Sequence, residues 1–518
     1  MLDDIAIRYG SAPALIRAGG SIGFDRLAAR AVSLAAGLRA EGVREGDIVL
    51  LLEQNGPAWL ETFFASTRLG AVVFAVNPGF RVAELADILR RTRARAIVFR
   101  RTLRGVDFAA VLSEASAASR WRPPLAIAID SPARARDILP YESFFRIAGL
   151  PKTAPAPEAG AVIFTTSGTT SQPKFVLHSH RSIVRHAADV AAGFGLHAAG
   201  TVLLQALPYS GVFGFCQALA AIVAGRPSVL LDTYDPAVAA DMIEDFAVTH
   251  FNATDEMLAM LAAAAATGDR SLASLRLVGA ASFNRGPDAL RAIARQSGMP
   301  IVGLYGMSET QALFARRALE DPDESRYCAG GRPVSPAASI RVRDGETGKA
   351  IGAAGRGGEI EIVGPSLFSG YYGDPSATAA ATAPDGAVRT GDFGWLSADG
   401  SFTFETRMGD ALRLGGYLVN PSEIADFVAS LPGIAACQVV GAEVDGRLKA
   451  VAFCIPADGG PIDVETVLTA CRAKLARFKV PAVVHELSAF PMVHSPNGAK
   501  IQRQALRDIA VKLVNALC

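Results

Sequence analysis

The sequence predicts an α/β protein with layered αβα sheets in a large N-terminal domain and a small α+β domain at the C-terminus. Three observations lead to this prediction. The chain has 518 residues, which is too long for one ordinary hydrophobic core. Short apolar runs alternate with helical patterns in the N-terminal part, as in proteins whose parallel sheets are covered by helices. The pattern then changes near Ala350 and again after Arg407.

Apolar runs and helical patterns place the first elements. The predicted strands are Ile48–Leu52, Ala71–Ala75, Ala96–Phe99 and Ser228–Leu231, and the predicted helices are Phe24–Glu41 and Ala58–Leu69. The segment from Ala350 to Phe404 has closely spaced strands, Gly358–Val363 and Ser401–Phe404, between turns rich in Gly, Pro and Asp. This spacing is typical of a small antiparallel or barrel-like subdomain.

The second change of pattern predicts a domain boundary. We expect an N-terminal domain over residues 1–408 and a C-terminal domain over residues 409–518, a common domain size. Within the C-terminal domain the sequence predicts helices at Pro421–Ala429, Val464–Leu475 and Arg503–Val514, and strands at Ala435–Val440 and Ala450–Ile455.

Composition excludes several classes of function. The formal net charge is +1, from 51 basic and 50 acidic residues, so no general attraction to nucleic acid is expected. The six cysteines have no metal-ligand spacing, which is typical of a reducing cytosol. The N-terminus lacks the pattern of a secretory signal, and the apolar stretch Cys216–Leu231 is too short for a membrane span. We expect a cytoplasmic protein.

A hydroxyl-rich loop follows the apolar run that ends at Phe164. It reads Phe164-Thr-Thr-Ser-Gly-Thr-Thr-Ser-Gln-Pro-Lys174. Backbone N–H groups and hydroxyls in such a loop bind phosphate oxygens, and Lys174 supplies a cation. The residues predicted to bind phosphate are Thr166, Ser167, Gly168, Thr169, Thr170 and Lys174. The alternative is an ordinary polar surface loop.

This loop resembles the phosphate-binding motif of the adenylate-forming superfamily, which contains acyl-CoA synthetases, peptide-synthetase adenylation domains and luciferases. Further matches follow in the family's order. They are Tyr305-Gly-Met-Ser-Glu-Thr310, Gly358-Glu-Ile, Gly370-Tyr-Tyr, Arg389-Thr-Gly-Asp392, Arg407, the Gly416 to Glu423 stretch and Lys500-Ile-Gln-Arg503. Each match is short, but the ordered set is specific.

The resemblance implies an enzyme that activates a carboxylic acid with ATP and Mg²⁺. It implies that Glu309 holds the metal, that Ser308 contacts the α-phosphate, and that Asp392 binds the ribose hydroxyls. Other implied nucleotide contacts are Tyr305 and Gly306 beside adenine, Gly279 and Ala280, and Arg407 at the ribose or phosphate end. The alternative for Tyr305 is an ordinary core aromatic residue.

The resemblance also implies two half-reactions. Lys500, in the turn-rich loop Ser495-Pro-Asn-Gly-Ala-Lys500, would act only in adenylation. The C-terminal domain would then turn, so that a thiol reaches the adenylate through the tunnel segment Gly415, Gly416 and Tyr417. Gly409 stands at the family's pivot position. We interpret Arg503 and Arg507 as solvated side chains.

Four segments are expected to line the acid pocket: Leu207–Gly214, Asn252–Glu256, Val278–Ala281 and Gly303–Leu304. The pocket candidates are Tyr209, Ser210, Gly211, Gly214, Gly303 and Leu304. The first segment has no Asp to pair with an α-amine, which disfavours an amino acid. Asp255 is the remaining acidic candidate, and we interpret it as a helix N-cap. The glycines suggest an apolar, deep pocket, so fatty, alicyclic and aryl acids all remain possible.

Three functions remain open. The leading prediction is an AMP-forming acid:CoA ligase, with ATP, Mg²⁺ and CoA as cofactors. The second is a free-standing enzyme that loads an acyl-carrier protein. The third is a catalytically weakened nucleotide-binding relative, suggested by Gly409, Ser171 and Ala499, which replace the family's usual residues. A homodimer is compatible with each of them.

Overall fold

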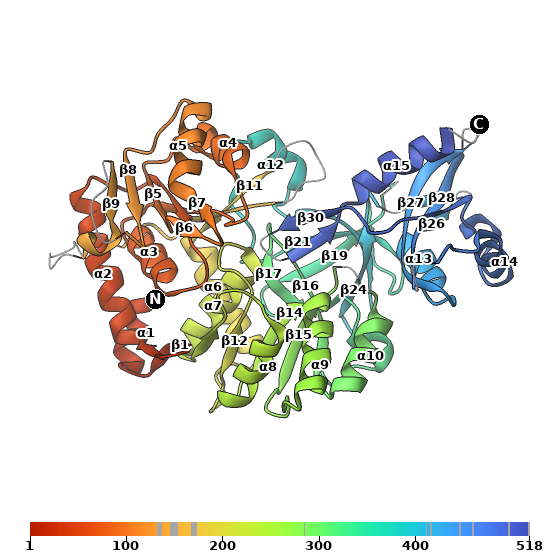
Figure 1. Cartoon of the computed structure of the whole chain (residues 1–518), viewed down its shortest axis with the longest axis horizontal. Coiled ribbons are helices and arrows are strands. Elements are labelled where there is room, and N and C mark those ends of the chain that lie inside the picture. Colours follow the sequence, from red (N-terminus) through yellow and green to blue (C-terminus); the bar gives the residue numbers. More distant parts are fainter. Residues whose placement is uncertain are drawn as a thin grey trace.

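Two large sheets and a separate C-terminal group of elements make up the molecule (Figure 1). The computed structural model describes residues 1–131, 137–145, 154–166, 173–283, 285–345, 347–410, 412–414, 417–444, 447–457, 460–495 and 498–515. The N-terminal elements lie at one end of the long axis, and the C-terminal helices and strands lie at the other.

The first sheet has eight strands. Their order is β22 (Gly370–Tyr371), β11 (Phe175–Ser179), β10 (Gly160–Thr165), β4 (Val72–Ala75), β3 (Ile48–Leu52), β5 (Ala96–Phe99), β8 (Leu125–Ala128) and β9 (Ile138–Pro140). The strands from β10 to β9 pair in parallel, and β11 and β22 are antiparallel additions. Their connecting helices include α2 (Phe24–Ala40), α3 (Pro57–Arg68), α4 (Val82–Thr92) and α5 (Phe108–Ser119).

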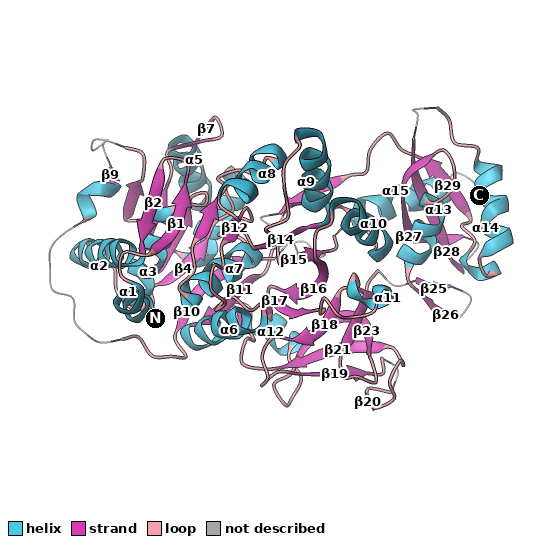
Figure 2. Ribbon diagram, turned by 90° about the horizontal axis from the view of Figure 1, so that it is seen from below, coloured by secondary structure: helices cyan, strands magenta, loops and turns pink. Residues whose placement is uncertain are grey.

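The second sheet has fourteen strands. They run β2 (Gly20–Gly23), β1 (Pro13–Arg17), β13 (Ser228–Leu230), β12 (Leu203–Gln205), β14 (His250–Thr254), β15 (Leu277–Ala281), β16 (Ile301–Met307), β17 (Gln311–Arg316), β18 (Gly330–Pro333), β24 (Phe402–Arg407), β23 (Val388–Leu396), β21 (Gly358–Val363), β19 (Ser339–Arg343) and β20 (Ala350–Ile351). From β16 onward the pairing is antiparallel. The strands from β18 onward form a lobe of their own in Figure 2, and this lobe contains the segment that the sequence predicts as a barrel-like subdomain.

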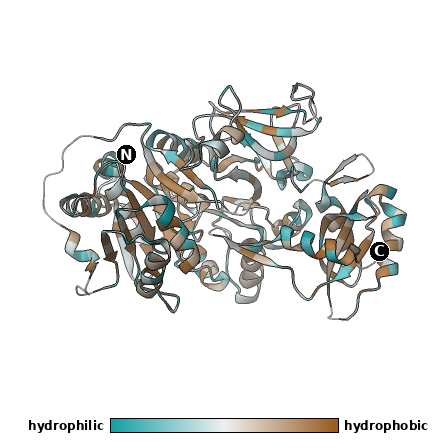
Figure 3. Cartoon of the chain, turned by 90° about the horizontal axis from the view of Figure 1, so that it is seen from above, coloured by the Kyte–Doolittle hydropathy of each residue, from teal (hydrophilic) through white to brown (hydrophobic). Residues whose placement is uncertain are grey.

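Helices α6 (His180–Gly193), α7 (Val212–Ala224), α8 (Pro236–Asp245), α9 (Asp255–Gly268) and α10 (Pro287–Ser297) connect the strands around the second sheet. The largest hydrophobic core joins α2, α3, α6 and α7 with strands of both sheets. The apolar stretch from Cys216 to Ala224 belongs to this core. In Figure 3 the central strands are hydrophobic, whereas the outer surfaces of the helices are more polar.

The C-terminal elements have their own core. Strands β27 (Ile434–Val444), β28 (Arg447–Pro456) and β29 (Val483–Glu486) form a sheet that packs with α13 (Pro421–Ala429), α14 (Val464–Lys474) and α15 (Arg503–Asn515). The predicted helix at Pro421–Ala429 is confirmed with both its bounds. Asn420 caps it through a hydrogen bond to the Ser422 N–H, and Pro421 occupies the first helical position.

The prediction that Lys500 lies in a loop is wrong. Lys500 is part of β31 (Gly498–Ile501), which pairs with β30 (Met492–Ser495) as an antiparallel hairpin. The side chain therefore projects from a paired strand, with Val493 as its cross-strand partner. Among the described residues, no helix is both long and apolar enough to cross a membrane.

Candidate active site

Asp392, Tyr305 and Arg407 form one connected cluster. The Tyr305 hydroxyl donates to Asp392 Oδ2 at 2.6 Å, and Arg407 Nε lies 2.9 Å from Asp392 Oδ1. Strands β23 and β24 bring the two charged residues together, because Asp392 and Arg407 are cross-strand partners. Burial raises the pKa of Asp392, and the Arg407 guanidinium opposes that shift. The cluster offers one carboxylate between an aromatic hydroxyl and a cation.

Tyr305 is a core aromatic residue whose hydroxyl contacts Asp392. Its ring packs edge-on against Phe402, with the centroids 5.1 Å apart, and it is 7% exposed. The aromatic ring is thus a core residue of the antiparallel lobe, while its hydroxyl faces Asp392. Gly306, the next residue, is exposed. The ring is therefore held rigidly beside the candidate ribose-binding carboxylate.

Tyr371 links Glu309 with Lys174. The Tyr371 hydroxyl donates to Glu309 Oε1 at 2.7 Å, and Lys174 Nζ lies 4.7 Å from the centroid of the same ring. Strand β22 makes this possible, since its pairing with β11 places Tyr371 beside the strand that follows Lys174. The sequence motif Gly370-Tyr-Tyr gave no role to Tyr371. The distance in sequence between Tyr371 and Glu309 could not have predicted their contact, because strand pairing in the sheet brings the two residues together.

His178 holds the segment that carries Ser308 and Glu309. Its Nε2–H donates to the Ser308 carbonyl oxygen at 2.8 Å, and the ring is fully buried. A carbonyl oxygen only accepts, so this nitrogen carries the proton. Burial lowers the pKa of His178 to about 4. The imidazole is therefore neutral near pH 7 and acts as a fixed hydrogen-bond donor.

The backbone after Glu309 is strained. Gln311 and Leu313 have φ angles of 66° and 63°, which cost roughly 1–2 kcal/mol for each non-glycine residue. The Gln311 side chain offsets part of this cost by donating to the carbonyl oxygens of Ser182 and Ser366, each at 3.1 Å. Such strain is found mostly where the surrounding structure fixes a functional segment.

Lys500 reaches these residues from the C-terminal part of the chain. Its Nζ lies 3.9 Å from the centroid of the Phe283 ring. Burial and then the nearby Arg407 guanidinium lower the pKa of Lys500 to about 8, and Asp255 opposes the shift. Lys500 and Arg407 are therefore close enough to repel each other. Both would be neutralised by an anion bound between them.

Asp255 is not the N-cap that the sequence predicts. Thr254 caps α9, with its hydroxyl accepting from the Met257 N–H, and Asp255 is the first helical residue. The Asp255 carboxylate accepts from the backbone N–H groups of Phe283 and Arg285 at 3.1 and 2.6 Å. It is fully buried. Asp255 thus holds the loop that carries Phe283 under Lys500.

The glycines of the proposed acid pocket do not leave open space on their side-chain face. A Cβ atom at Gly279 would lie 2.2 Å from Asn252 Oδ1, and one at Gly303 would lie 2.1 Å from the Cys328 carbonyl oxygen. At Gly214 it would lie 2.4 Å from the Leu207 carbonyl oxygen. The prediction of a deep pocket at these glycines is wrong, because their missing side chains allow close packing instead. Ala280 and Leu304 are buried beside them on β15 and β16.

Tyr209 also lies in the core. Its ring packs 5.4 Å from that of Trp59 and is 1% exposed. Neither its hydroxyl nor that of Ser210 has a hydrogen-bond partner among the described residues. Gly211 is the N-cap of α7 and is buried. Tyr209 therefore anchors the Leu207–Gly214 segment to the hydrophobic core.

The segment after the predicted pivot is tied to the last helix. Asp410 lies 2.9 Å from Arg503 Nη1 and 2.9 Å from Arg507 Nη1 on α15. The interpretation of these two arginines as solvated is wrong. A Cβ atom at Gly409 would meet nothing within 4 Å. The chain is thus anchored to α15 at Asp410 and sterically unrestricted one residue earlier.

Some predicted site residues lie outside the described part of the chain. They are Ser167, Gly168, Thr169, Thr170, Gly415 and Gly416. Next to the first group, the Thr166 N–H donates to the Lys174 carbonyl oxygen at 3.0 Å, which closes the ends of that loop. Tyr417 begins strand β26 (Tyr417–Val419), paired with β25 (Leu412–Leu414).

Known proteins match this chain in sequence over most of its length. The sequence model of the AMP-binding enzymes matches residues 2–372. Pyochelin synthase PchD of Pseudomonas aeruginosa is 32% identical over 94% of this chain and 87% of its own length. The 2-hydroxy-7-methoxy-5-methyl-1-naphthoate–CoA ligase of Streptomyces carzinostaticus is 30% identical, over 95% of this chain and 89% of its own.

The fold has a close structural counterpart. The crystal structure of the anthranilate CoA ligase AuaEII in complex with anthranoyl-AMP superposes with a TM-score of 0.86, at 23% identity, over 99% of this chain and 98% of that one. Identity at this level shows a shared fold, including the large N-terminal and small C-terminal domains. Because the family model matches residues 2–372, the chain belongs to the family of AMP-binding enzymes.

Proposed function

We propose that this adenylating enzyme is an AMP-forming aryl acid:CoA ligase. The observation that carries the proposal is the position of Lys500 beside Phe283, close to Arg407 and therefore to Asp392 and Tyr305. In this proposal Lys500 and Arg407 flank the place where a carboxylate attacks the α-phosphate of ATP. Stabilising the charge that develops at that phosphorus is the main catalytic requirement.

The residues present suit ATP with Mg²⁺. The described residues contain no group of three metal-ligating side chains, but Mg²⁺ bound to a nucleotide needs only one or two carboxylates besides the phosphates. Glu309 is buried, and the Tyr371 hydroxyl orients it. In this proposal Glu309 holds the metal, Asp392 binds the ribose, and Lys174 and Lys500 contact phosphate oxygens. The metal would supply charge neutralisation between the phosphates.

The acid is proposed to lack an α-amine. Asp255 lies within one of the four segments proposed to line the acid pocket. Both of its carboxylate oxygens already accept hydrogen bonds from backbone N–H groups. An ammonium group buried there would have no free carboxylate. Two relatives have names that mention aryl acids, a naphthoate and an anthranilate, which favours the aryl class over the fatty and alicyclic classes.

Pyrophosphate exchange with a matched panel tests the proposal. The panel contains benzoate, 2-hydroxybenzoate, 2-aminobenzoate, cyclohexanecarboxylate, hexanoate and phenylalanine. We expect exchange with the aryl acids and none with phenylalanine. CoA-dependent release of AMP then tests the acceptor. Exchange with no acid would contradict adenylation, and transfer only to a carrier protein would contradict the assignment of CoA.

The pH dependence of adenylation should follow Lys500. A lysine is cationic below its pKa and neutral above it, and the pKa of Lys500 is about 8. We expect kcat/KM for ATP, which reports the free enzyme, to fall as the pH rises through about 8. In Lys500→Arg the side chain stays charged, so the fall should disappear at whatever rate that variant retains. A fall at the same pH in both proteins would assign it to another group.

Tyr371→Phe should weaken ATP binding modestly. The variant keeps the ring under Lys174 but removes the hydrogen bond to Glu309, and one such bond contributes about 0.5–1.5 kcal/mol. We expect the apparent affinity for MgATP to fall about 2- to 12-fold. The Mg²⁺ concentration needed for half-maximal exchange should rise. Titration of exchange with Mg²⁺ measures this. Tyr372→Phe, at the next residue, is the control and should behave as the parent protein.

A further inference from the structure

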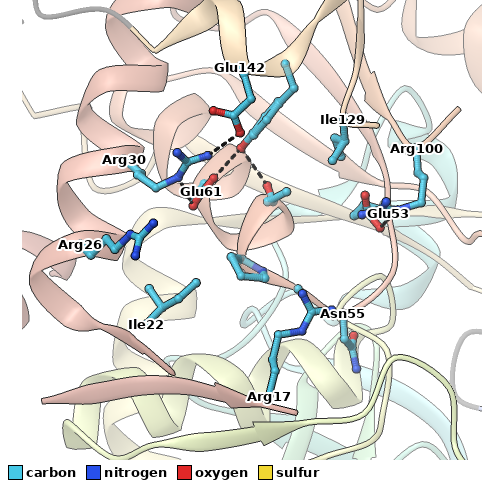
Figure 4. Close-up of a pocket in the computed structure, with 14 residues that line it drawn as sticks. Arg17, Ile22, Arg26, Arg30, Glu53, Asn55, Glu61, Arg100, Ile129 and Glu142 are labelled. Atoms are coloured by element: carbon cyan, nitrogen blue, oxygen red, sulfur yellow. Dashed lines mark hydrogen bonds and ion pairs between the residues drawn. The ribbon is translucent and has the colours of Figure 1, made fainter. Parts of the chain in front are cut away.

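Two arginines beside the first sheet join its elements through ion pairs. Figure 4 shows them at the wall of a cavity of about 320 Å³. Arg30 on α2 pairs with Glu61 on α3 at 2.6 Å, and Arg100 after β5 pairs with Glu53 after β3 at 2.9 Å. In both cases a carboxylate balances the charge of the guanidinium, and the pair connects two neighbouring elements.

Arg91, near the end of α4, has a different set of contacts. Its Nη1 donates to the Pro173 carbonyl oxygen at 2.9 Å and lies 3.2 Å from Asp87 Oδ2. The carbon at the centre of its guanidinium lies 3.5 Å from the centroid of the Phe175 ring, which is within the range of a cation–π contact. Pro173 and Phe175 are the two neighbours of Lys174 in sequence. Arg91 therefore contacts the chain on both sides of this lysine.

The Phe175 ring joins Arg91 to the hydrophobic core. The Phe74 ring on β4 packs against it edge-on, with the two centroids 4.8 Å apart. The Phe175 side chain is 1% exposed, whereas the Arg91 side chain is 25% exposed. The guanidinium thus covers a core ring while it keeps part of its hydration, and this arrangement makes a cation–π contact favourable.

The chain at Lys174 is held at two further points. The Lys174 carbonyl oxygen accepts from the N–H of Thr166, which follows β10, at 3.0 Å. The carbonyl oxygen of the next residue accepts from the N–H of Tyr372, which follows β22, at 2.7 Å. Arg91 holds the carbonyl oxygen of the residue before. The backbone that carries the lysine is therefore fixed over three consecutive residues.

We propose that Arg91 is a positioning residue for the phosphate site. By holding Pro173 and Phe175, it fixes the backbone of Lys174 and therefore the place of the Lys174 ammonium group. The inference rests on the proposed function, in which Lys174 contacts phosphate oxygens of ATP. Precise placement matters there, because a displacement of about 1 Å at a reacting centre can cost roughly 100-fold in rate.

The planar guanidinium of Arg91 suits this role. Its flat face lies over the Phe175 ring, while an N–H at its edge donates to the Pro173 carbonyl oxygen. An ammonium group is a compact charge without a flat face, so a lysine could not make both contacts in the same way.

Calorimetric titration of the full chain with MgATP, and separately with adenosine, tests the proposal. Adenosine has no phosphate, so its affinity should not depend on Lys174. We expect Arg91→Gln to lower the affinity for MgATP at least about 5-fold, since it removes one cation–π contact and one hydrogen bond. Its affinity for adenosine should stay unchanged. An equal loss for both ligands would assign Arg91 a structural role only, and no loss for MgATP would also overturn the proposal.

Arg91→Lys separates positioning from charge. The variant keeps the cation and the aliphatic stem, so it should fold, but it should bind MgATP as weakly as Arg91→Gln does. The parent's affinity in Arg91→Lys would contradict positioning by the planar group. Arg93→Gln is the matched control, because Arg93 lies at the same end of α4 with its guanidinium 5.1 Å from the centroid of the Trp121 ring. It should bind MgATP as the parent does.

Lys174→Ala distinguishes a failure of this inference from a failure of the proposed function. We expect it to lower the affinity for MgATP at least as much as Arg91→Gln does. A loss in Lys174→Ala with the parent's affinity in Arg91→Gln would overturn the role of Arg91 alone. The parent's affinity in both variants would remove Lys174 from the phosphate site, and that part of the proposed function would fail together with the inference.

Discussion

Lys500→Ala should slow adenylate formation about 100- to 1,000-fold, the usual cost of removing one group that stabilises charge in the transition state. Thioester formation from supplied acyl-adenylate should survive nearly intact. The reason is positional. Lys500 reaches Phe283 and the vicinity of Arg407 only because the β30–β31 hairpin lies against the large domain, and the proposed thiol-transfer state would withdraw it.

The two half-reactions are measured separately, by pyrophosphate exchange and by CoA-dependent consumption of supplied adenylate. Lys512→Ala is a matched control, because Lys512 is an exposed lysine of the same domain, in the last turn of α15. It should leave both rates unchanged. Equal loss of both half-reactions in Lys500→Ala would contradict the division of labour between two arrangements of the C-terminal domain.

Asp392→Asn should raise the KM for ATP about 10- to 100-fold, since hydrogen bonds to a charged group contribute about 1.5–3 kcal/mol. The variant keeps the size of the side chain but removes its charge. Arg407, 2.9 Å away in the parent, would lose its ion-pair partner, and the ribose hydroxyls would lose one of two carboxylate acceptors. ATP titration of pyrophosphate exchange measures the effect.

A second aspartate on the same β-hairpin supplies the control. Asp399 lies between β23 and β24 and pairs with Arg332 at the surface, so Asp399→Asn should leave the KM for ATP unchanged. An unchanged KM in Asp392→Asn would remove Asp392 from the nucleotide site. A loss of folded protein without any change in KM would assign to the residue a structural role only.

The segment from Arg407 to Ala429 shows how much a local sequence pattern can establish. The change of pattern near Arg407 and the capped helix at Pro421–Ala429 follow from local signals, and the helix has the predicted bounds. The partners of Asp410 do not follow from local signals. Arg503 and Arg507 are more than 90 residues away in sequence, and nothing in their helix distinguishes a paired arginine from a solvated one.

In the candidate site, too, the sequence predicts some features and not others. The motifs around Glu309, Asp392 and Lys500 are visible in the sequence, and Glu309 lies within the part of the chain that the family model matches. The contacts that orient these residues are not visible. Tyr371 meets Glu309 through the pairing of β22 with β11, and Asp255 holds Phe283 across a gap of 28 residues.

The sequence by itself determined many of the elements, the order of the motifs and the class of chemistry, because these depend on local propensities and on residue types at fixed spacing. Only the tertiary structure decided that Lys500 lies on a paired strand, that the glycines of the acid segments serve close packing, and that Asp410 pairs with two arginines of the last helix. The physical reason is that each of these facts depends on strand register and on which distant segments pack together. A one-residue slip in register would turn those side chains to the other face of a sheet.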